Sequence, residues 1–450
     1  MKAFKAYDIR GVWGTDLDEN IAYRIGYFLP DVLNTKTFLV GYDMRLSSET
    51  AFRQLTKGLN DRGVDVDNIG LSTTPLIYWA TARFGYEASV MITASHNPSN
   101  HNGFKISTKD AKPVGYDTGL SKLERLVESD LPTPVSNKRG TTKDIDIYSK
   151  YIDFQRKFLG NLDNIRVAVD CSNGASCLFI KKLLGDTPFY INDILDGRFP
   201  GHEPNPLEAC NQVQIKETVL KNKCDIGLLF DGDADRITFI DEKGRFISPD
   251  LIIAFLGNYF FGEKHQKGIV LQDIRSSRAI QEYLGRLYGA KVETWRVGRA
   301  YAALKLRELD GCFGGELAGH YYFRDFYYSD SGIMAALLVL RLLSRFKSEG
   351  KTMSQIINEI SSYHNSGEIN FTIEDKQIAM DAVREHFIND EKPEQFLDFD
   401  GYRLDYKDWW LNIRPSNTEP YLRFLAEAKS KEKLDEIVST VTDIINSKIK

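Results

Sequence analysis

Residues 88–98 read Ala88-Ser89-Val90-Met91-Ile92-Thr93-Ala94-Ser95-His96-Asn97-Pro98. The apolar run that ends at Ile92 predicts a buried β-strand, and Asn97-Pro98 requires the chain to turn just after it. Ser95 is therefore expected to lie exposed at the end of a strand. Two interpretations fit this stretch. One is an ordinary polar turn, because Ser, Asn and Pro favour turns through local hydrogen bonds and backbone preferences. The other is a loop whose serine carries phosphate covalently.

The segment before this strand has two counterparts farther along the chain. Asp43, Asp170 and Asp273 each follow a short apolar run and precede small polar residues, and they lie 127 and 103 residues apart. These intervals indicate three copies of one strand–helix unit. Each copy is followed by a second loop of unusual composition, at residues 93–98, 231–236 and 314–320. Because ligand-binding loops of parallel α/β sheets lie beyond the carboxyl ends of the strands, three related domains can bring these loops to one cleft.

The C-terminal part of the chain has a different pattern. The helical pattern lapses around residues 361–367, and two strand-like runs, 409–413 and 421–426, flank a turn at 414–420. Apolar residues spaced three and four apart then predict a final helix over 434–445. We therefore expect a small α+β domain that closes the molecule.

The composition is that of a globular protein, with 42% hydrophobic and 27% charged residues, and 450 residues suit about three or four domains. A net charge of −5 argues against general nucleic-acid binding, which needs a clustered cationic surface. The longest apolar stretch, residues 333–340, is too short to cross a membrane, and the first residues lack the apolar segment of a signal peptide. Five scattered cysteines indicate reduced thiols. We expect a soluble cytoplasmic protein that binds neither nucleic acid nor a membrane.

The stretch Asp231-Gly232-Asp233-Ala234-Asp235-Arg236 lies between two apolar runs. Three carboxylates so close together raise one another's pKa unless a cation compensates them, and oxygen ligands of this kind suit Mg²⁺ or Ca²⁺. An EF-hand is excluded, because Arg236 stands where that loop needs glycine and both flanks are strand-like. A solvated acidic turn remains an alternative. In a second alternative, Asp231 is the nucleophile of a haloacid-dehalogenase-type phosphoryl transferase. Two features argue against it: Asp235 stands where those proteins usually have Thr or Val, and their motif usually lies near the N-terminus.

Two further loops have compositions suited to a sugar phosphate. In Gly314-Gly315-Glu316-Leu317-Ala318-Gly319-His320, glycines allow close approach, and a carboxylate such as Glu316 can accept hydrogen bonds from sugar hydroxyls. The turn 414–420 combines a guanidinium with hydroxyls and an amide, as a phosphate-binding clamp would; its candidate ligands are Arg414, Ser416, Asn417 and Thr418, with Arg423 beyond. A glycine-rich turn and a capped polar turn are the simpler alternatives.

Taken together, these loops resemble those of the α-D-phosphohexomutase family, in particular its bacterial phosphomannomutase/phosphoglucomutase group. The resemblance covers essentially the whole chain and all four loops in order. It implies that Ser95 is carried as phosphoserine and that Mg²⁺ is held by this phosphate with Asp231, Asp233 and Asp235. It also implies the roles of the other site residues: Tyr7, Arg10, His96 and Lys105 line the transfer site, Arg236 follows the metal loop, Glu316 and His320 lie in the sugar-reading loop, and Arg414, Ser416, Asn417 and Thr418 hold the non-reacting phosphate.

The resemblance also implies a domain organisation. We expect an α/β protein in which three related α/β domains with mixed sheets and a smaller α+β C-terminal domain surround a central cleft. The expected domains are 1–143 with the phosphoserine loop, 144–247 with the metal-binding loop, 248–360 with the sugar-binding loop, and 361–450 with the phosphate-binding loop.

Three residues depart from the family pattern. Ala318 replaces a usual serine, Arg299 stands where histidine is common, and Arg275 stands where many members have lysine. Arg275 and Arg299 remain candidate substrate-binding residues, since an added guanidinium can contact phosphate or hydroxyl groups. These departures bear on the choice of sugar more than on the reaction.

The activity implied is a phosphohexomutase that interconverts the 1- and 6-phosphates of mannose or glucose through phosphoserine and a hexose 1,6-bisphosphate. His96, Lys105 and Arg10 are the candidates for acid, base or electrostatic roles, with no order among them. Two alternatives are a Mg²⁺-dependent sugar-phosphate phosphatase and a non-catalytic sugar-phosphate-binding protein. We expect a monomer or homodimer whose ligands are small hexose phosphates.

Overall fold

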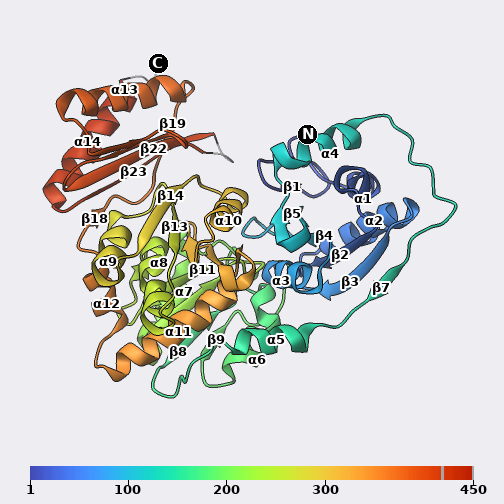
Figure 1. The fold of residues 1–450 in the computed structure, drawn as a ribbon, viewed down its shortest axis with the longest axis horizontal. Coiled ribbons are helices and arrows are strands. Elements are labelled where there is room, and N and C mark those ends of the chain that lie inside the picture. Colours follow the sequence, from blue (N-terminus) through green and yellow to red (C-terminus); the bar gives the residue numbers. More distant parts are fainter. Residues whose placement is uncertain (417–419, 448–450) are drawn as a thin grey trace.

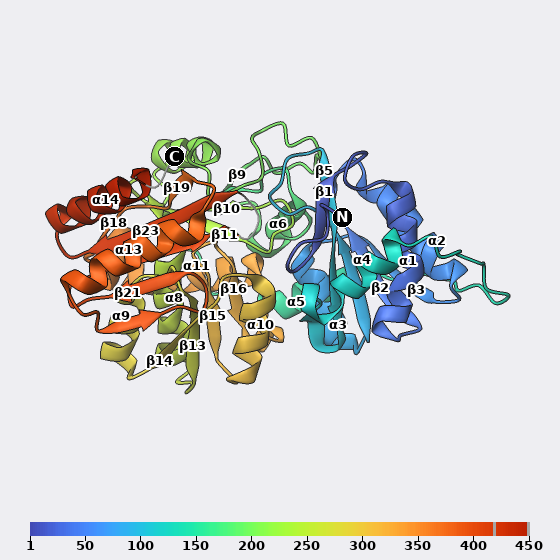
Figure 2. The same ribbon diagram turned by 90° about the horizontal axis from the view of Figure 1, so that it is seen from above.

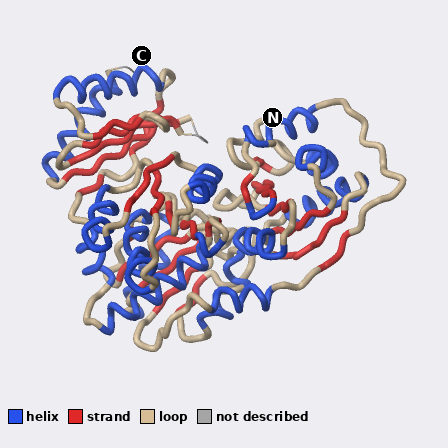
Figure 3. The backbone as a smooth tube through the Cα atoms, in the orientation of Figure 1, coloured by secondary structure: helices blue, strands red, loops and turns tan. Residues whose placement is uncertain are grey.

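A computed structural model describes residues 1–416 and 420–447, which form four β-sheets in sequence order. Figure 1 shows the first sheet with its helices on the right, the next two on the left, and the C-terminal sheet above them. Figure 3, which separates strands from helices by colour, shows helices flanking all four sheets. The predicted class, three α/β domains with mixed sheets and a smaller C-terminal domain, is confirmed.

The first domain contains the strand predicted at residues 88–92. Its elements are β1 (Ile9–Val12), α1 (Glu19–Leu33), β2 (Thr37–Tyr42), α2 (Ser48–Asp61), β3 (Asp65–Leu71), α3 (Thr74–Phe84), β4 (Ala88–Ile92), β5 (His101–Thr108), η1 (Lys109–Ala111), β6 (Lys112–Pro113), η2 (Tyr116–Thr118), α4 (Leu120–Glu128) and β7 (Thr142–Asp144). All five residues of β4 are buried, and β4 pairs parallel with β2 and antiparallel with β5. β7 pairs with β3, so the first sheet extends one residue beyond the predicted boundary at 143.

The second domain is built around a sheet in the order β12-β11-β10-β8-β9. Its elements are α5 (Tyr148–Arg156), β8 (Val167–Asp170), η3 (Ala175–Leu178), α6 (Ile180–Leu184), β9 (Phe189–Ile191), η4 (Ala209–Gln212), α7 (Val213–Asn222), β10 (Ile226–Phe230), β11 (Ile237–Asp241) and β12 (Phe246–Ile247). The acidic residues 231–236 connect β10 to its antiparallel neighbour β11.

The third domain repeats this arrangement in the order β14-β13-β15-β16-β17. Its elements are α8 (Pro249–Gly257), η5 (Asn258–Glu263), β13 (Ile269–Asp273), α9 (Arg278–Tyr288), β14 (Lys291–Trp295), α10 (Arg299–Glu308), β15 (Phe313–Gly315), β16 (Tyr321–Phe323), η6 (Arg324–Phe326), β17 (Ser329–Asp330), α11 (Gly332–Ser348) and α12 (Met353–Ile360). In each of the first three domains, the loop of unusual composition (93–98, 231–236 or 314–320) joins a strand with a parallel partner to an antiparallel neighbour: β4 to β5, β10 to β11, and β15 to β16. This shared topology explains the repeat seen in the sequence.

The first three domains share a hydrophobic core. It includes Leu76 to Ala80 of α3, Phe230 of β10 and the apolar run 333–340 of α11. Because residues 333–340 of α11 are apolar on all sides of the helix, this run is buried between neighbouring elements, as expected of a central core helix. No helix within residues 1–416 and 420–447 is long and apolar enough to cross a membrane.

The fourth domain has its own core and an antiparallel sheet in the order β18-β23-β22-β21-β20, with β19 paired to β23. Its elements are β18 (His364–Asn365), β19 (Ile369–Thr372), α13 (Lys376–Asp390), β20 (Gln395–Leu397), β21 (Tyr402–Asp405), β22 (Trp409–Pro415), β23 (Tyr421–Ala428) and α14 (Lys431–Asn446). Figures 1 and 2 show α13 and α14 on the same face of this sheet. The fourth domain contacts the third through Arg403, which donates to the carbonyls of Ile274 and Ser276.

Candidate active site

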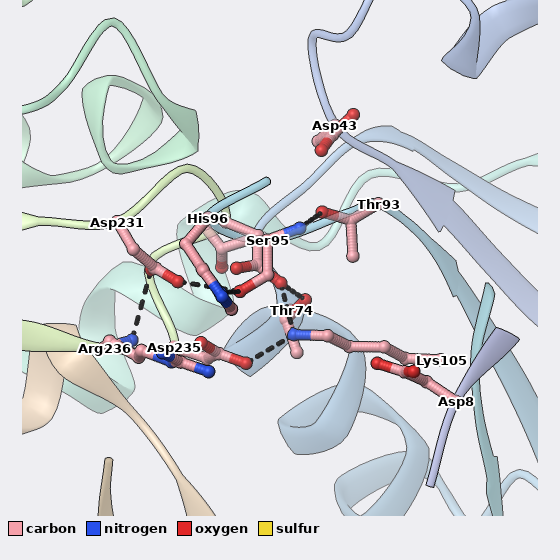
Figure 4. Close-up of polar contacts among 12 residues, drawn as sticks. Asp8, Asp43, Thr74, Thr93, Ser95, His96, Lys105, Asp231, Asp235 and Arg236 are labelled. Atoms are coloured by element: carbon pink, nitrogen blue, oxygen red, sulfur yellow. Dashed lines mark hydrogen bonds and ion pairs between the residues drawn. The ribbon is translucent and has the colours of Figure 1, made fainter. Parts of the chain in front are cut away.

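The serine loop, residues 93–98, meets the acidic loop, residues 231–236, at Ser95. The Oγ atom of Ser95 donates to Oδ2 of Asp231 at 2.9 Å and lies 3.4 Å from Nδ1 of His96 (Figure 4). A Cβ on Gly232 would lie 2.5 Å from the carbonyl oxygen of Ser95, so glycine lets the loops meet. Ser95 is only 1% exposed. The expectation that it is exposed is wrong, because the second domain covers this end of β4.

Three fully buried carboxylates, those of Asp231, Asp233 and Asp235, lie beside Ser95 with ligand atoms within 4.8 Å of one another. Nζ of Lys105, on β5, is 2.6 Å from Oδ2 of Asp233 and 2.5 Å from Oδ2 of Asp235. Burial and the two neighbouring carboxylates raise the pKa of Asp231 well above its usual value. Burial opposes the charge on Lys105, but Asp233 and Asp235 raise the pKa of its ammonium above the usual value. Lys105 therefore stays charged and neutralises part of the acidic cluster.

The acidic cluster fits a hard divalent cation. Oδ1 of Asp233 and Oδ1 of Asp235 are buried and have no hydrogen-bond partner among residues 1–416 and 420–447. Buried polar atoms are normally paired, and carboxylate oxygens are the ligands that Mg²⁺ prefers. The cluster therefore offers two unused oxygen ligands next to Ser95.

Of two further predicted residues, Arg10 lies against the serine loop and His96 is part of it. Arg10, on β1, donates through Nη1 to Oδ1 of Asn97 at 2.8 Å and through Nη2 to Oδ2 of Asp8 at 2.5 Å. Burial, together with the positive charges of Arg236 and Arg10, lowers the pKa of His96 well below its usual value. The His96 imidazole is therefore neutral at pH 7, with a ring nitrogen close to Ser95 Oγ.

A chain of contacts connects the second and third domains. Nε of Arg236 donates to Nε2 of His320 at 2.9 Å, and Nδ1 of His320 lies 2.7 Å from Oδ2 of Asp330. Because Nε2 accepts from Arg236, the ring hydrogen is assigned to Nδ1, which donates to Asp330. Nε of Arg299 donates to Oδ1 of Asp330 at 3.1 Å, and its guanidinium lies 3.6 Å from the ring centroid of Tyr78. Three predicted residues thus lie in one chain fixed by Asp330.

The glycine-rich loop, residues 314–320, carries Glu316 as predicted. Glu316 is buried, its Oε1 accepts from the hydroxyl of Tyr322 at 2.7 Å, and burial raises its pKa. Tyr7 reaches this side of the molecule from the first domain: its ring lies edge-on to that of Tyr301, with centroids 6.2 Å apart. A Cβ on Gly298 would lie 2.8 Å from the Tyr7 ring. The first and third domains are therefore in close contact beside the residues predicted to bind the sugar.

Arg275 and Arg423 lie on either side of one carboxylate. Glu368 Oε2 is 3.6 Å from Nη1 of Arg275, and Glu368 Oε1 is 3.0 Å from Nη1 of Arg423. Arg275 is also paired with Asp273, whose Oδ2 accepts from the backbone N–H of Leu317. Ion pairs and a final backbone hydrogen bond therefore connect the fourth domain to the glycine-rich loop.

Arg414 and Ser416, the other clamp residues that the structure describes, lie on the fourth domain. Arg414 donates twice to Oδ1 of Asp400, at 3.1 and 2.9 Å, and Oδ2 of Asp400 accepts from the N–H of Val297 at 2.8 Å. The backbone N–H of Ser416 donates to the carbonyl of Tyr421. The predicted ligands Asn417 and Thr418 lie outside the described residues.

Three site residues were missed by the sequence analysis. Thr74, at the start of α3, donates through its hydroxyl to Asp233 and through its N–H to the Asp233 carbonyl. Asp330 holds His320 and Arg299, and Arg45 contacts the serine loop. Only Arg45 had a signal, because it follows Asp43 in the repeated strand–helix pattern. Thr74 and Asp330 approach the site only through packing between domains.

Comparison with known proteins finds matches along most of the chain. The four phosphoglucomutase/phosphomannomutase domain models match in order: alpha/beta/alpha domain I over residues 1–132, domain II over 148–244, domain III over 248–363 and the C-terminal domain over 368–444.

Curated relatives match over nearly their full length. A phosphomannomutase of Escherichia coli K12 is 36% identical over 448 residues, covering 97% of each chain. One from Methanocaldococcus jannaschii is 35% identical, covering 99% of this chain and 98% of its own. A crystal structure of a phosphoglucomutase/phosphomannomutase family protein from Burkholderia thailandensis has a TM-score of 0.87 at 26% identity, covering 99% of this chain and 97% of its own. The chain therefore belongs to the phosphoglucomutase/phosphomannomutase family and is an isomerase of the phosphomutase type.

Proposed function

We propose that this protein interconverts hexose 1-phosphate and hexose 6-phosphate, with Ser95 carrying the transferred phosphate and a hexose 1,6-bisphosphate as intermediate. One observation carries the proposal: the hydroxyl of Ser95 lies 2.9 Å from a carboxylate of a buried acidic cluster that is paired with Lys105. A serine whose only role was to form a turn would not need a buried acidic cluster and a buried lysine beside its hydroxyl. Because the curated relatives are phosphomannomutases, mannose phosphates are the first substrates to test, with glucose phosphates second.

The transfer breaks one P–O bond and forms another. A sugar hydroxyl oxygen bonds to phosphorus, the bond from phosphorus to Ser95 Oγ breaks, and the hydroxyl proton replaces phosphate on Oγ. The bisphosphate then turns over in the site and returns its other phosphate to Ser95. Neutral His96, 3.4 Å from Oγ, is placed to accept and return the proton, whereas Lys105 is held charged. Catalysis of this kind depends mainly on positioning and charge neutralisation.

Two sets of groups would neutralise the transferring phosphate. Lys105, Arg10 and Arg236 supply fixed positive charge around the serine loop. Mg²⁺, held by Asp231, Asp233 and Asp235 together with the phosphoserine, would supply Lewis-acid stabilisation of the phosphate oxygens.

Substrate recognition is proposed to use residues of the third domain for the sugar and residues of the fourth domain for the phosphate. Glu316 and Arg299 would read the sugar hydroxyls, and Arg275 would assist from the third domain. His320, whose two ring nitrogens pair with Arg236 and Asp330, would orient Arg236 beside the substrate. The clamp of Arg414, Ser416, Asn417, Thr418 and Arg423 would hold the idle phosphate. Because Arg414 and Arg423 already pair with Asp400 and Glu368, a bound phosphate would share these guanidinium groups with the carboxylates.

The test is a coupled assay of 1-phosphate to 6-phosphate conversion with Mg²⁺ and a trace of hexose bisphosphate. Mannose and glucose 1-phosphate are supplied separately, to wild type and to Ser95→Ala. We expect isomerisation by the wild type and almost none by Ser95→Ala. Release of free phosphate, with Ser95→Ala fully active, would instead identify a phosphatase that uses the acidic loop. Binding without turnover in both proteins would identify a sugar-phosphate-binding protein.

A further inference from the structure

Arg45, which follows β2, lies beneath the serine loop with a fully buried side chain. Its guanidinium makes five hydrogen bonds. Nη2 donates to the carbonyls of Ser95 at 2.8 Å and Asn97 at 2.7 Å, and Nη1 donates to the carbonyls of Pro98 at 2.7 Å and His101 at 3.1 Å. A guanidinium has five N–H donors. The fifth, on Nε, bonds Oδ2 of Asp43 at 3.2 Å, so none is left over.

Three of the four carbonyls that Arg45 binds belong to the turn between β4 and β5, and the fourth is that of His101, the first residue of β5. Ser95 has a left-handed backbone there, with φ of +52°, a conformation that non-glycine residues keep only where their surroundings impose it. Carbonyl dipoles that point at one place repel one another unless a donor lies between them. Hydrogen bonds from a charged donor are stronger than neutral ones. Arg45 therefore stabilises this loop conformation, together with the Thr93 hydroxyl, which accepts from the N–H of Ser95 at 2.9 Å.

The position of Arg45 is itself fixed from two sides. Oδ1 of Asp43 accepts from the Arg45 N–H at 3.1 Å and from the hydroxyl of Ser48 at 2.6 Å, which orients the carboxylate that balances the buried charge (Figure 4 labels Asp43 above the serine loop). On the side of the second domain, the Phe199 ring lies 5.0 Å from the guanidinium, and a Cβ on Gly197 would lie 2.7 Å from Arg45 Cα. Arg45 is thus enclosed between the serine loop and the second domain.

We propose that Arg45 is a positioning residue for phosphoryl transfer, which places Ser95 Oγ against Asp231 by binding the carbonyls of the turn. The proposal rests on the phosphoserine function proposed above. Arg45 acts through the backbone and touches no group assigned to the substrate. Lysine cannot replace it, because an ammonium offers three donors from one nitrogen and lacks the planar fork of a guanidinium.

The test compares Arg45→Lys with wild type and with Arg53→Lys, a matched control on the exposed side of α2. Each enzyme is phosphorylated with hexose bisphosphate, and the single-turnover transfer of phosphate to hexose 1-phosphate is followed by rapid quench. KM and the thermal unfolding midpoint are measured in parallel. Because a misplacement of about 1 Å can cost about 100-fold in rate, we expect Arg45→Lys to transfer about 100-fold more slowly, with KM within about twofold of wild type. Arg53→Lys should match wild type.

Two results would overturn the proposal: transfer by folded Arg45→Lys within about threefold of wild type, or a loss seen mainly in KM. Asp43→Asn is the second variant, and it decides the question if Arg45→Lys does not fold. It keeps the four carbonyl contacts but frees Nε, so we expect a loss of about 10-fold in transfer rate with unchanged KM; no loss contradicts the proposal. Ser95→Ala separates the two hypotheses. If it stays active, the phosphoserine function itself fails, whereas an inactive Ser95→Ala beside a fast Arg45→Lys removes only the role of Arg45.

Discussion

Replacing Lys105 with methionine should destabilise the protein strongly and make its stability depend on Mg²⁺. Nζ of Lys105 lies 2.6 Å from Asp233 and 2.5 Å from Asp235, and both carboxylates are fully buried. At an effective dielectric constant of about 20, each contact is worth about 6 kcal/mol of Coulomb attraction, most of it offset by the cost of burying the charges. Breaking such a pair typically costs about 3–5 kcal/mol. We expect this loss in the free energy of unfolding of Lys105→Met without metal.

The assay is urea unfolding of wild type and Lys105→Met, with EDTA and with millimolar Mg²⁺. A bound divalent cation replaces the missing positive charge, so Mg²⁺ should stabilise Lys105→Met more than wild type. Lys431→Met is the control: Lys431 forms an exposed pair with Asp435 on α14, and such pairs contribute less than about 1 kcal/mol. If Lys105→Met unfolds within about 1 kcal/mol of wild type in EDTA, or if Mg²⁺ stabilises both equally, Lys105 does not compensate the acidic cluster.

Three further predictions concern single residues. Burial raises the pKa of Glu427 to about 7, above the unfolded value near 4.5, so its ionisation costs stability as pH rises through this range. Both oxygens of Glu427 accept N–H hydrogen bonds, so Glu427→Gln loses one of them at every pH, but between pH 4.5 and pH 8 urea unfolding should find that wild type loses about 1–3 kcal/mol more stability than Glu427→Gln. Asp330→Asn removes the carboxylate that orients His320 and should lower kcat about 10- to 100-fold in the coupled assay, while circular dichroism shows a folded protein. Gly232→Ala would place a methyl 2.5 Å from the Ser95 carbonyl and should slow phosphorylation of Ser95, measured by intact mass, at least 10-fold; an unchanged rate would show that the loops can separate without effect.

Much of the fold could be predicted because its signals are local. The buried strand 88–92, the strand-like runs at 409–413 and 421–426 and the final helix all appear in the structure as β4, β22, β23 and α14. The threefold repeat was visible because each copy ends a strand with aspartate and small polar residues. Two of the three loops could be identified for a related reason: the clustered acids of 231–236 and the glycines of 314–320 are uncommon in turns that serve only to reverse the chain.

What the sequence could not give is the contact between domains. Ser95 was expected to be exposed, since a strand end with Asn-Pro beside it is usually at the surface, yet the acidic loop of the second domain covers it. Thr74 and Asp330 have ordinary neighbours in the sequence and become site residues only when α3 and β17 pack against the acidic loop and His320. Arg45 lies two residues after Asp43 of the repeated pattern, but its four contacts with backbone carbonyls beyond β4 depend on the pairing of β2 with β4.

The most direct test of the central claim is to follow phosphate on Ser95 itself. Wild-type enzyme is incubated with hexose 1,6-bisphosphate labelled in its phosphates, digested and mapped, and the labelled enzyme is then mixed with unlabelled hexose 1-phosphate. The account predicts one labelled peptide that contains Ser95, and transfer of its label into hexose bisphosphate when the sugar is added. Label on Asp231, or label that leaves only as free phosphate, would contradict it.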